Sequence, residues 1–200
     1  MLASNGAEDV DKPIYDNSID WESLPGYVNT EIAIQNPFTF YYKSMNDWSS
    51  SHNYDYWNIN FTGAAGVNNT ATEKTVYDPS VSGFTLPRTA AFTGFTTTGN
   101  NTSNSSEFNV SGSWDNGLIF FTGVGSNTIS FEAFGYRETY NGATGYVSGN
   151  GTEGIFWQSG ASSVSFARNL DFVPDRVYPQ HVYNRSYGFS VRPVSEDNSN

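Results

Sequence analysis

Short runs in which apolar and polar residues alternate, separated by turns rich in Gly and Asn, fill most of the second half of this chain. The side chains of a β-strand point to opposite faces in turn, so a period of two between turn residues indicates antiparallel strands. We therefore expect strands at 108–110, 117–124, 128–134, 136–140, 154–159, 164–172 and 187–194. In the last of these, Phe189 and Val191 share one parity, which predicts a buried closing strand.

A helical pattern stands out at one place. Residues 88–95 follow Pro87 and place Ala91, Phe92 and Phe95 at helical spacing, which predicts a short helix. The chain as a whole is therefore expected to consist mostly of antiparallel strands and long loops, with one or two short helices.

The length of 200 residues suits one domain with short tails. Residues 1–29 lack periodicity and carry Pro and Gly among acidic residues, which indicates a linker or an arm along the domain. The domain is expected at 30–194, beginning with a strand at 30–40, and residues 195–200 are expected to be a disordered tail. The aromatic-rich segment 47–60 is typical of a loop that packs against a core.

Charge and composition exclude several classes of protein. The net charge is −11, with few and scattered Lys and Arg, whereas a nucleic-acid partner requires a basic face. The absence of Cys removes disulfides, thiolate metal sites and cysteine nucleophiles. Aromatic residues outnumber charged ones, at 16% against 14%, which is typical of β-rich proteins outside the cell. No apolar run reaches membrane-spanning length, so direct membrane insertion is not expected.

Few patterns point to catalysis. The two histidines, His52 and His181, are too few for a multi-histidine zinc site, and the Gly-x-Ser-x-Gly pattern of serine hydrolases does not occur. Segment 149–154 matches the glycine pattern of dinucleotide-binding loops, but without a following helix it favours a hairpin turn. We therefore expect no enzyme, no cofactor and no metal. A carbohydrate-active enzyme is a distant alternative. The carboxylates that would have to converge for that chemistry are Glu132, Glu138, Glu153 and Asp171.

Four segments, taken in order, resemble one known family. They are KTVYDP at 74–79, GFTLP at 83–87, FGYR at 134–137 and NRSYGFSVRP at 184–193. Together they are similar to the C-type-lectin-like domains of gut Bacteroidetes surface proteins, of the Fibrobacter major paralogous domain type. The resemblance implies an α+β C-type lectin fold over most of 30–194, and an extracellular binding module on a bacterial cell surface or a phage tail.

Two activities found with this wider fold are not implied. The Glu-Pro-Asn or Gln-Pro-Asp and Trp-Asn-Asp motifs of calcium-dependent lectins do not occur, and the acidic residues are dispersed. Formylglycine-generating enzymes use cysteines for their oxidase chemistry, and this chain has none.

Some domains of this kind are variable proteins of diversity-generating retroelements, in which adenines of the C-terminal coding region are copied with errors. An Asn codon changed only at its adenines cannot become Lys, Glu, Gln, Met or Trp, and between 159 and 187 only Gln180 belongs to that excluded set. The resemblance thus implies a ligand-binding surface in this region. Its candidate residues are Ser162, Ser163, Ser165, Arg168, Asp171, Val173, Asp175, Arg176, Tyr178, Gln180, His181 and Tyr183. The scaffold residues between them would be Leu170, Phe172, Val177 and Pro179.

The expected function is adhesion or receptor recognition of a protein or glycan ligand, because Tyr, Arg and His on a rigid scaffold suit a binding surface. The alternative is a constant structural module of a surface lipoprotein or pilus tip, in which this stretch is an ordinary surface loop. The binding hypothesis requires six residues to be at least partly exposed on one contiguous face. They are Arg168, Asp171, Arg176, Tyr178, His181 and Tyr183.

Overall fold

A computed structural model of the chain describes Gln35 and residues 53–196, apart from positions 62, 65, 68, 124, 141 and 142. The predicted arm at 1–29 lies outside the described residues, as does the predicted first strand at 30–40 except for Gln35. That residue is helical, so the extended chain predicted through it is wrong at this position.

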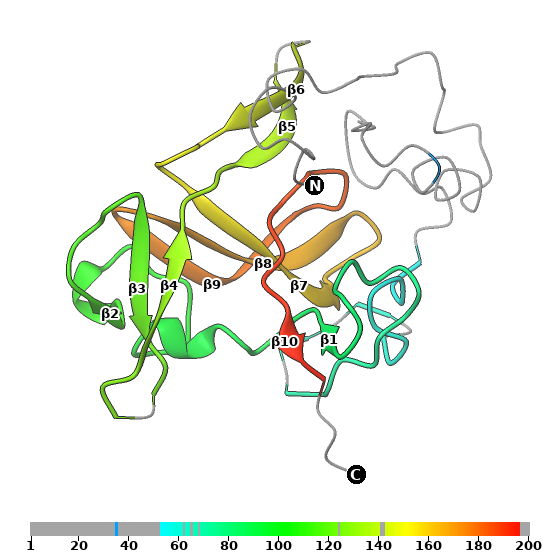
Figure 1. Ribbon diagram of the computed structural model, residues 1–200, viewed down its shortest axis with the longest axis horizontal. Coiled ribbons are helices and arrows are strands. Elements are labelled where there is room, and N and C mark those ends of the chain that lie inside the picture. Colours follow the sequence, from blue (N-terminus) through cyan, green and yellow to red (C-terminus); the bar gives the residue numbers. More distant parts are fainter. Residues whose placement is uncertain are drawn as a thin grey trace.

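The described chain is built mostly of antiparallel strands, as predicted, with very few helical residues (Figure 1). The strands are β1 (Phe84–Thr85), β2 (Val110–Ser111), β3 (Gly117–Phe121), β4 (Thr128–Glu132), β5 (Tyr136–Tyr140), β6 (Ala143–Ser148), β7 (Gly154–Ala161), β8 (Phe166–Val173), β9 (Arg176–Asn184) and β10 (Val194–Ser195). They form antiparallel sheets in the orders β1-β10, β2-β3-β4, β5-β6 and β7-β8-β9. Two 3₁₀ turns, η1 (Thr93–Phe95) and η2 (Ser105–Glu107), precede β2.

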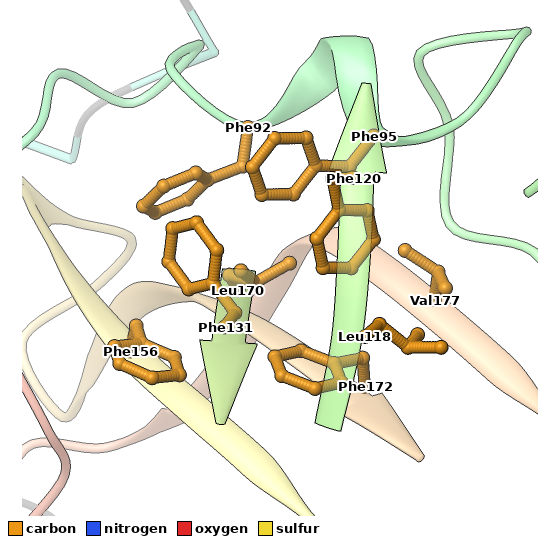
Figure 2. Packing of buried hydrophobic residues seen from close by; sticks show 9 residues of the cluster. All are labelled: Phe92, Phe95, Leu118, Phe120, Phe131, Phe156, Leu170, Phe172 and Val177. Carbon is orange, nitrogen blue, oxygen red and sulfur yellow. The ribbon is translucent and has the colours of Figure 1, made fainter. Parts of the chain in front are cut away.

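The main core lies between the β2-β3-β4 sheet and one face of the β7-β8-β9 sheet. Figure 2 shows phenylalanine rings from both sheets and from η1 pointing toward one another. The Phe120 ring stacks on Phe95 with 4.0 Å between centroids, and Phe131 meets Phe156 edge-on at 4.9 Å. Burying each such side chain contributes roughly 1.5–3 kcal/mol, so these rings fix how the two sheets lie on each other.

A second, smaller core covers the opposite face of the β7-β8-β9 sheet. Its fully buried members are Leu86, Trp157 and Ala167. Trp57 packs on Trp157 with 5.6 Å between ring centroids, which confirms for this residue the prediction that the aromatic-rich loop docks on a core. The half-buried residues that complete this core include Tyr183, Tyr187 and Phe189, so it reaches the edge of strand β9.

The predicted helix at 88–95 is wrong. The backbone instead makes successive bonds between residues three apart, among them Phe95 N–H to the Phe92 carbonyl at 3.0 Å, and ends in η1. Phe92 and Phe95 are buried, but Ala91 is exposed. A 3₁₀ turn places residues three apart on one side. The neighbouring Thr and Gly residues disfavour an α-helix here.

Three further expectations need correction. The segment 187–193 forms single bridges, Gly188 with Arg137 and Ser190 with Phe156, rather than a closing strand, and only Val194 is in a strand, β10. Phe189 and Val191 are half-buried. Segment 149–154 is a tight turn, but it joins β6 to β7 in different sheets and is therefore no hairpin.

The predicted tail begins too early. Ser195 pairs with Phe84, and the Glu196 amide donates to the Gly83 carbonyl at 3.0 Å.

Candidate functional site

A one-residue bulge in β9 places the candidate residues. Asn169 pairs with His181 but Asp171 pairs with Tyr178, so two steps along β8 correspond to three along β9. Directly paired residues point to the same side of a sheet. The bulge, at Pro179 and Gln180, therefore brings Tyr178 and His181 to one side although their parities differ.

The resulting surface is named here the β9 face, and it consists of Arg176, Tyr178, His181 and Tyr183. Arg176 pairs with Val173 and Tyr183 with Ala167, so both share the side of Asp171. All four side chains are half-buried. The opposite side of the same strands carries Phe172, Leu170 and Val177 of the main core, which fixes which way the β9 face points.

A charged centre lies beneath the β9 face. Arg176 Nη2 is 2.7 Å from Glu153 Oε1 and 3.1 Å from Asp171 Oδ2, and His181 Nδ1 is 3.5 Å from the same Asp171 oxygen. The exposed fractions of these side chains are 1% for Asp171, 15% for Glu153, 29% for His181 and 31% for Arg176. Arg176 and His181 are thus partly exposed to solvent, whereas the Asp171 carboxylate that both approach is fully buried.

Burial and charge act on the ionisable groups in opposite directions. Burial is the largest influence on the pKa of Arg176 and lowers it, but Asp171 and Glu153 together outweigh it and the pKa is raised. The pKa of His181 is lowered, mainly by burial, although Asp171 opposes this effect. Burial, and then the negative charges of Asp171 and Glu153, raise the pKa of Tyr183 to about 12. The Tyr183 hydroxyl therefore keeps its proton at physiological pH.

Aromatic rings continue from the β9 face onto neighbouring elements. His181 lies between Tyr178 and Tyr183, at 5.5 and 4.9 Å between ring centroids. Tyr187 and Tyr136 follow, with Tyr187 5.5 Å from Tyr183 and nearly parallel to Tyr136 at 6.2 Å. The rings come from β5, β9 and the segment after β9, so the folded chain assembles this row from separate parts of the sequence.

The outer edge of β9 is held by residues 101–103. Thr102 and Val177 exchange backbone hydrogen bonds of 3.0 and 2.9 Å, and the hydroxyls of Ser103 and Tyr178 lie 3.1 Å apart. The bulge residue Gln180 donates from Nε2 to the Thr89 carbonyl at 2.9 Å and from its amide to Asn101 Oδ1 at 2.9 Å. Gln180 thus anchors the strand, and its side chain is directed to the chain's own backbone.

Two of the six residues expected to be exposed together depart from that expectation. Asp171 is buried, because Arg176 and His181 cover its carboxylate. Arg168 pairs with Val182 and alternates with Asn169 on β8, so it lies on the side opposite the β9 face. Burial lowers the pKa of Arg168.

The other candidates lie at the two ends of the β8-β9 hairpin. Val173 is the last residue of β8, and the exposed Asp175 lies in the turn that follows it. Ser162, Ser163 and Ser165 are half-buried in the loop before β8, where Ser163 Oγ accepts from the amides of Ser165 and Phe166 and shapes the loop. The twelve candidates therefore do not form one surface.

Sequence reasoning missed three contributors to the site, Glu153, Tyr136 and Tyr187. Glu153 was considered only as one of several carboxylates that could converge. Tyr136 and Tyr187 both lie within segments that carry the family resemblance, at 134–137 and 184–193. Each of those two segments holds one tyrosine, and its place within a motif segment was the available signal.

No protein-family model, curated protein or solved structure matches this chain. Within the described residues no group of three or more His, Asp or Glu side chains could hold a metal ion. No helix in that same part of the chain is both long and apolar enough to cross a membrane.

Proposed function

We propose that this chain is an extracellular ligand-binding module on a C-type lectin scaffold, which engages a protein or glycan through the β9 face. The observation that carries the proposal is a row of half-exposed aromatic side chains held by the charged centre and by residues 101–103. Aromatic side chains fixed before binding offer contact area at low entropic cost, which is the chemistry of a recognition surface.

The scaffold and the location are proposed from the resemblance. The motif segments 74–79 and 83–87 support it by meeting in the folded chain, since Asp78 Oδ2 accepts from Thr85 Oγ1 and from the Leu86 amide, each at 3.0 Å. We place the module on a bacterial cell surface or a phage tail, where a retroelement would diversify the β9 face.

Binding is favoured over catalysis by the arrangement of the acidic residues. Of the four carboxylates considered for glycoside chemistry, Glu153 and Asp171 do come together, but Arg176 lies between them and bonds to both. A general acid and a base need free access to a substrate bond, and here one guanidinium bonds to both Asp171 oxygens and to Glu153 Oε1.

The proposal is tested by presenting the full chain to a printed array of neutral and acidic oligosaccharides and to a displayed peptide library. For any ligand captured, Tyr178→Ala should weaken binding about tenfold or more, because a central aromatic contact is lost. The melting temperature of the variant should stay within a few degrees of wild type.

Arg168→Ala is the matched control, since Arg168 lies on the same hairpin but on the opposite side. Its affinity should equal that of wild type. Equal loss in both variants would contradict the β9 face as the site. Failure of the wild-type chain to capture any ligand would favour the constant structural module. A reverse transcriptase gene and a near-copy of the 3′ coding region beside the gene would support diversification.

A further inference from the structure

The two nitrogens of His181 have different surroundings. Nδ1 is buried, has no hydrogen-bond partner among the described residues, and faces Asp171 Oδ2 at 3.5 Å. The side chain as a whole is 29% exposed, so the rest of the ring, with Nε2 on its far side, is the part that can meet a ligand. Tyr178 and Tyr183 flank the ring on either side.

Asp171 decides which nitrogen of the neutral ring carries the proton. A bare Nδ1 would point its lone pair at a carboxylate, which is electrostatically unfavourable, whereas an Nδ1–H is attracted to it. The partner of one imidazole nitrogen fixes the tautomer in this way. Nε2 is then left without a proton and acts as a hydrogen-bond acceptor at neutral pH.

We propose that His181 determines ligand specificity by accepting, through Nε2, a hydrogen bond from an N–H group of the ligand, and that acid therefore releases the ligand. This inference rests on the proposed function and names the chemistry at its centre. Protonation of the imidazole converts Nε2 from acceptor to donor, so the same ligand group would then meet a second donor.

The charged or titratable groups around His181 are Tyr178, whose ring lies beside it, and four others, and they are compatible with release of the ligand on protonation. Asp171 on β8 attracts the imidazolium, and Arg176 on β9 disfavours it. Glu153 enters from the turn before β7 and bonds to Arg176. Tyr183, with a pKa of about 12, keeps its proton throughout. Burial lowers the pKa of His181, so the ring is neutral at pH 7.5.

The first arm of the test needs no ligand. Long-range ¹H–¹⁵N correlation spectra of the ¹⁵N-labelled full chain at pH 7.5 should show a protonated Nδ1 and a bare Nε2 for His181, assigned by comparison with His181→Gln. Asp171→Asn provides the matched control, since it removes the negative charge and should shift the tautomer toward Nε2–H. A wild-type ring protonated at Nε2 at pH 7.5 would overturn the inference.

The second arm uses the strongest oligosaccharide or peptide from the two libraries as the probe. Wild-type affinity should fall as the pH is lowered from 7.5 to 4.5, by up to roughly tenfold once the imidazole is protonated, about the effect of one lost hydrogen bond at a desolvated site. His181→Gln keeps an acceptor that does not titrate, so it should retain binding at both pH values. His181→Ala should bind weakly at both.

The outcomes separate the two proposals. Binding that does not change with pH in wild type, or is unaffected in His181→Ala, overturns the role of His181 and leaves the β9 face standing as a binding surface. Absence of any wild-type binding at either pH overturns the proposed function, and this inference with it.

Discussion

Asp171 is the residue on which the charged centre depends, because Arg176 and His181 both approach its carboxylate. Replacing Asp171 by Ala leaves the Arg176 guanidinium with Glu153 alone and opens a small void beneath the β9 face. Breaking a buried ion pair costs about 3–5 kcal/mol, and since Arg176 is 31% exposed, solvent reduces the expected loss to about 2–3 kcal/mol. Urea unfolding monitored by tryptophan fluorescence measures it.

Asp175→Ala is the control for this change. Asp175 is exposed in the turn between β8 and β9, so its removal should alter the free energy of unfolding by no more than about 0.5 kcal/mol. Equal urea midpoints for the two variants would show that Asp171 has no stabilising partner.

The sequence could not reveal the burial of Asp171, since an acidic residue amid Arg, Tyr and His is typical of a surface. Its burial is made possible by Arg176 across a hairpin, whose guanidinium also bonds to Glu153 from another turn. The meeting of these three residues depends on strand pairing. Tyr178, His181 and Tyr183 are half-buried neighbours, and the sequence could single them out because each is a polar aromatic residue that suits such a position.

At the scale of elements, Asp78 connects the turn at 76–80 to strand β1. Its carboxylate accepts from the Ser80 amide at 2.8 Å, and from Thr85 Oγ1 and the Leu86 amide. The side chain is buried. Asp78→Ala would leave these donors unpaired in the interior and should cost about 2–4 kcal/mol, measured as a lowered urea midpoint.

The neighbouring Val76→Ala serves as a reference, since Val76 is 91% exposed and should change stability little. Amide hydrogen exchange distinguishes a local from a global effect. If Asp78 holds β1 in place, exchange should accelerate at Leu86 in Asp78→Ala before the main core is affected. Unchanged exchange at Leu86 would contradict this role.

Elements were predicted best where the pattern is local. β5 has the predicted bounds 136–140, and β3, β4, β7 and β8 overlap predicted strands. β9 was treated as a surface stretch because Pro179 and the bulge break its alternation. The helix expected at 88–95 failed because two phenylalanines three residues apart suit a 3₁₀ turn equally well.

At the scale of the molecule, the β7-β8-β9 sheet separates two cores and carries the candidate site at its edge. Antiparallel β architecture followed from period-two patterning, and the structure confirms it. The pairing of strands did not follow, as the turn at 149–154 illustrates. Its glycines indicate a turn, but whether β6 pairs with β7 or with β5 depends on packing of distant residues such as Phe172, whose ring lies against Gly154.

The bulge in β9 also determines where an insertion or deletion in the gene would preserve the orientation of the side chains on this strand. Gln180 is one residue more than the ladder with β8 requires, so a chain that lost it would still carry Tyr178, His181 and Tyr183 on one side. A chain that lost Val182 would bring Tyr183 opposite Arg168 and turn its ring to the other side of the sheet. Among descendants of one ancestral gene, insertions and deletions should therefore be absent between His181 and Asn184, which an alignment of relatives would reveal.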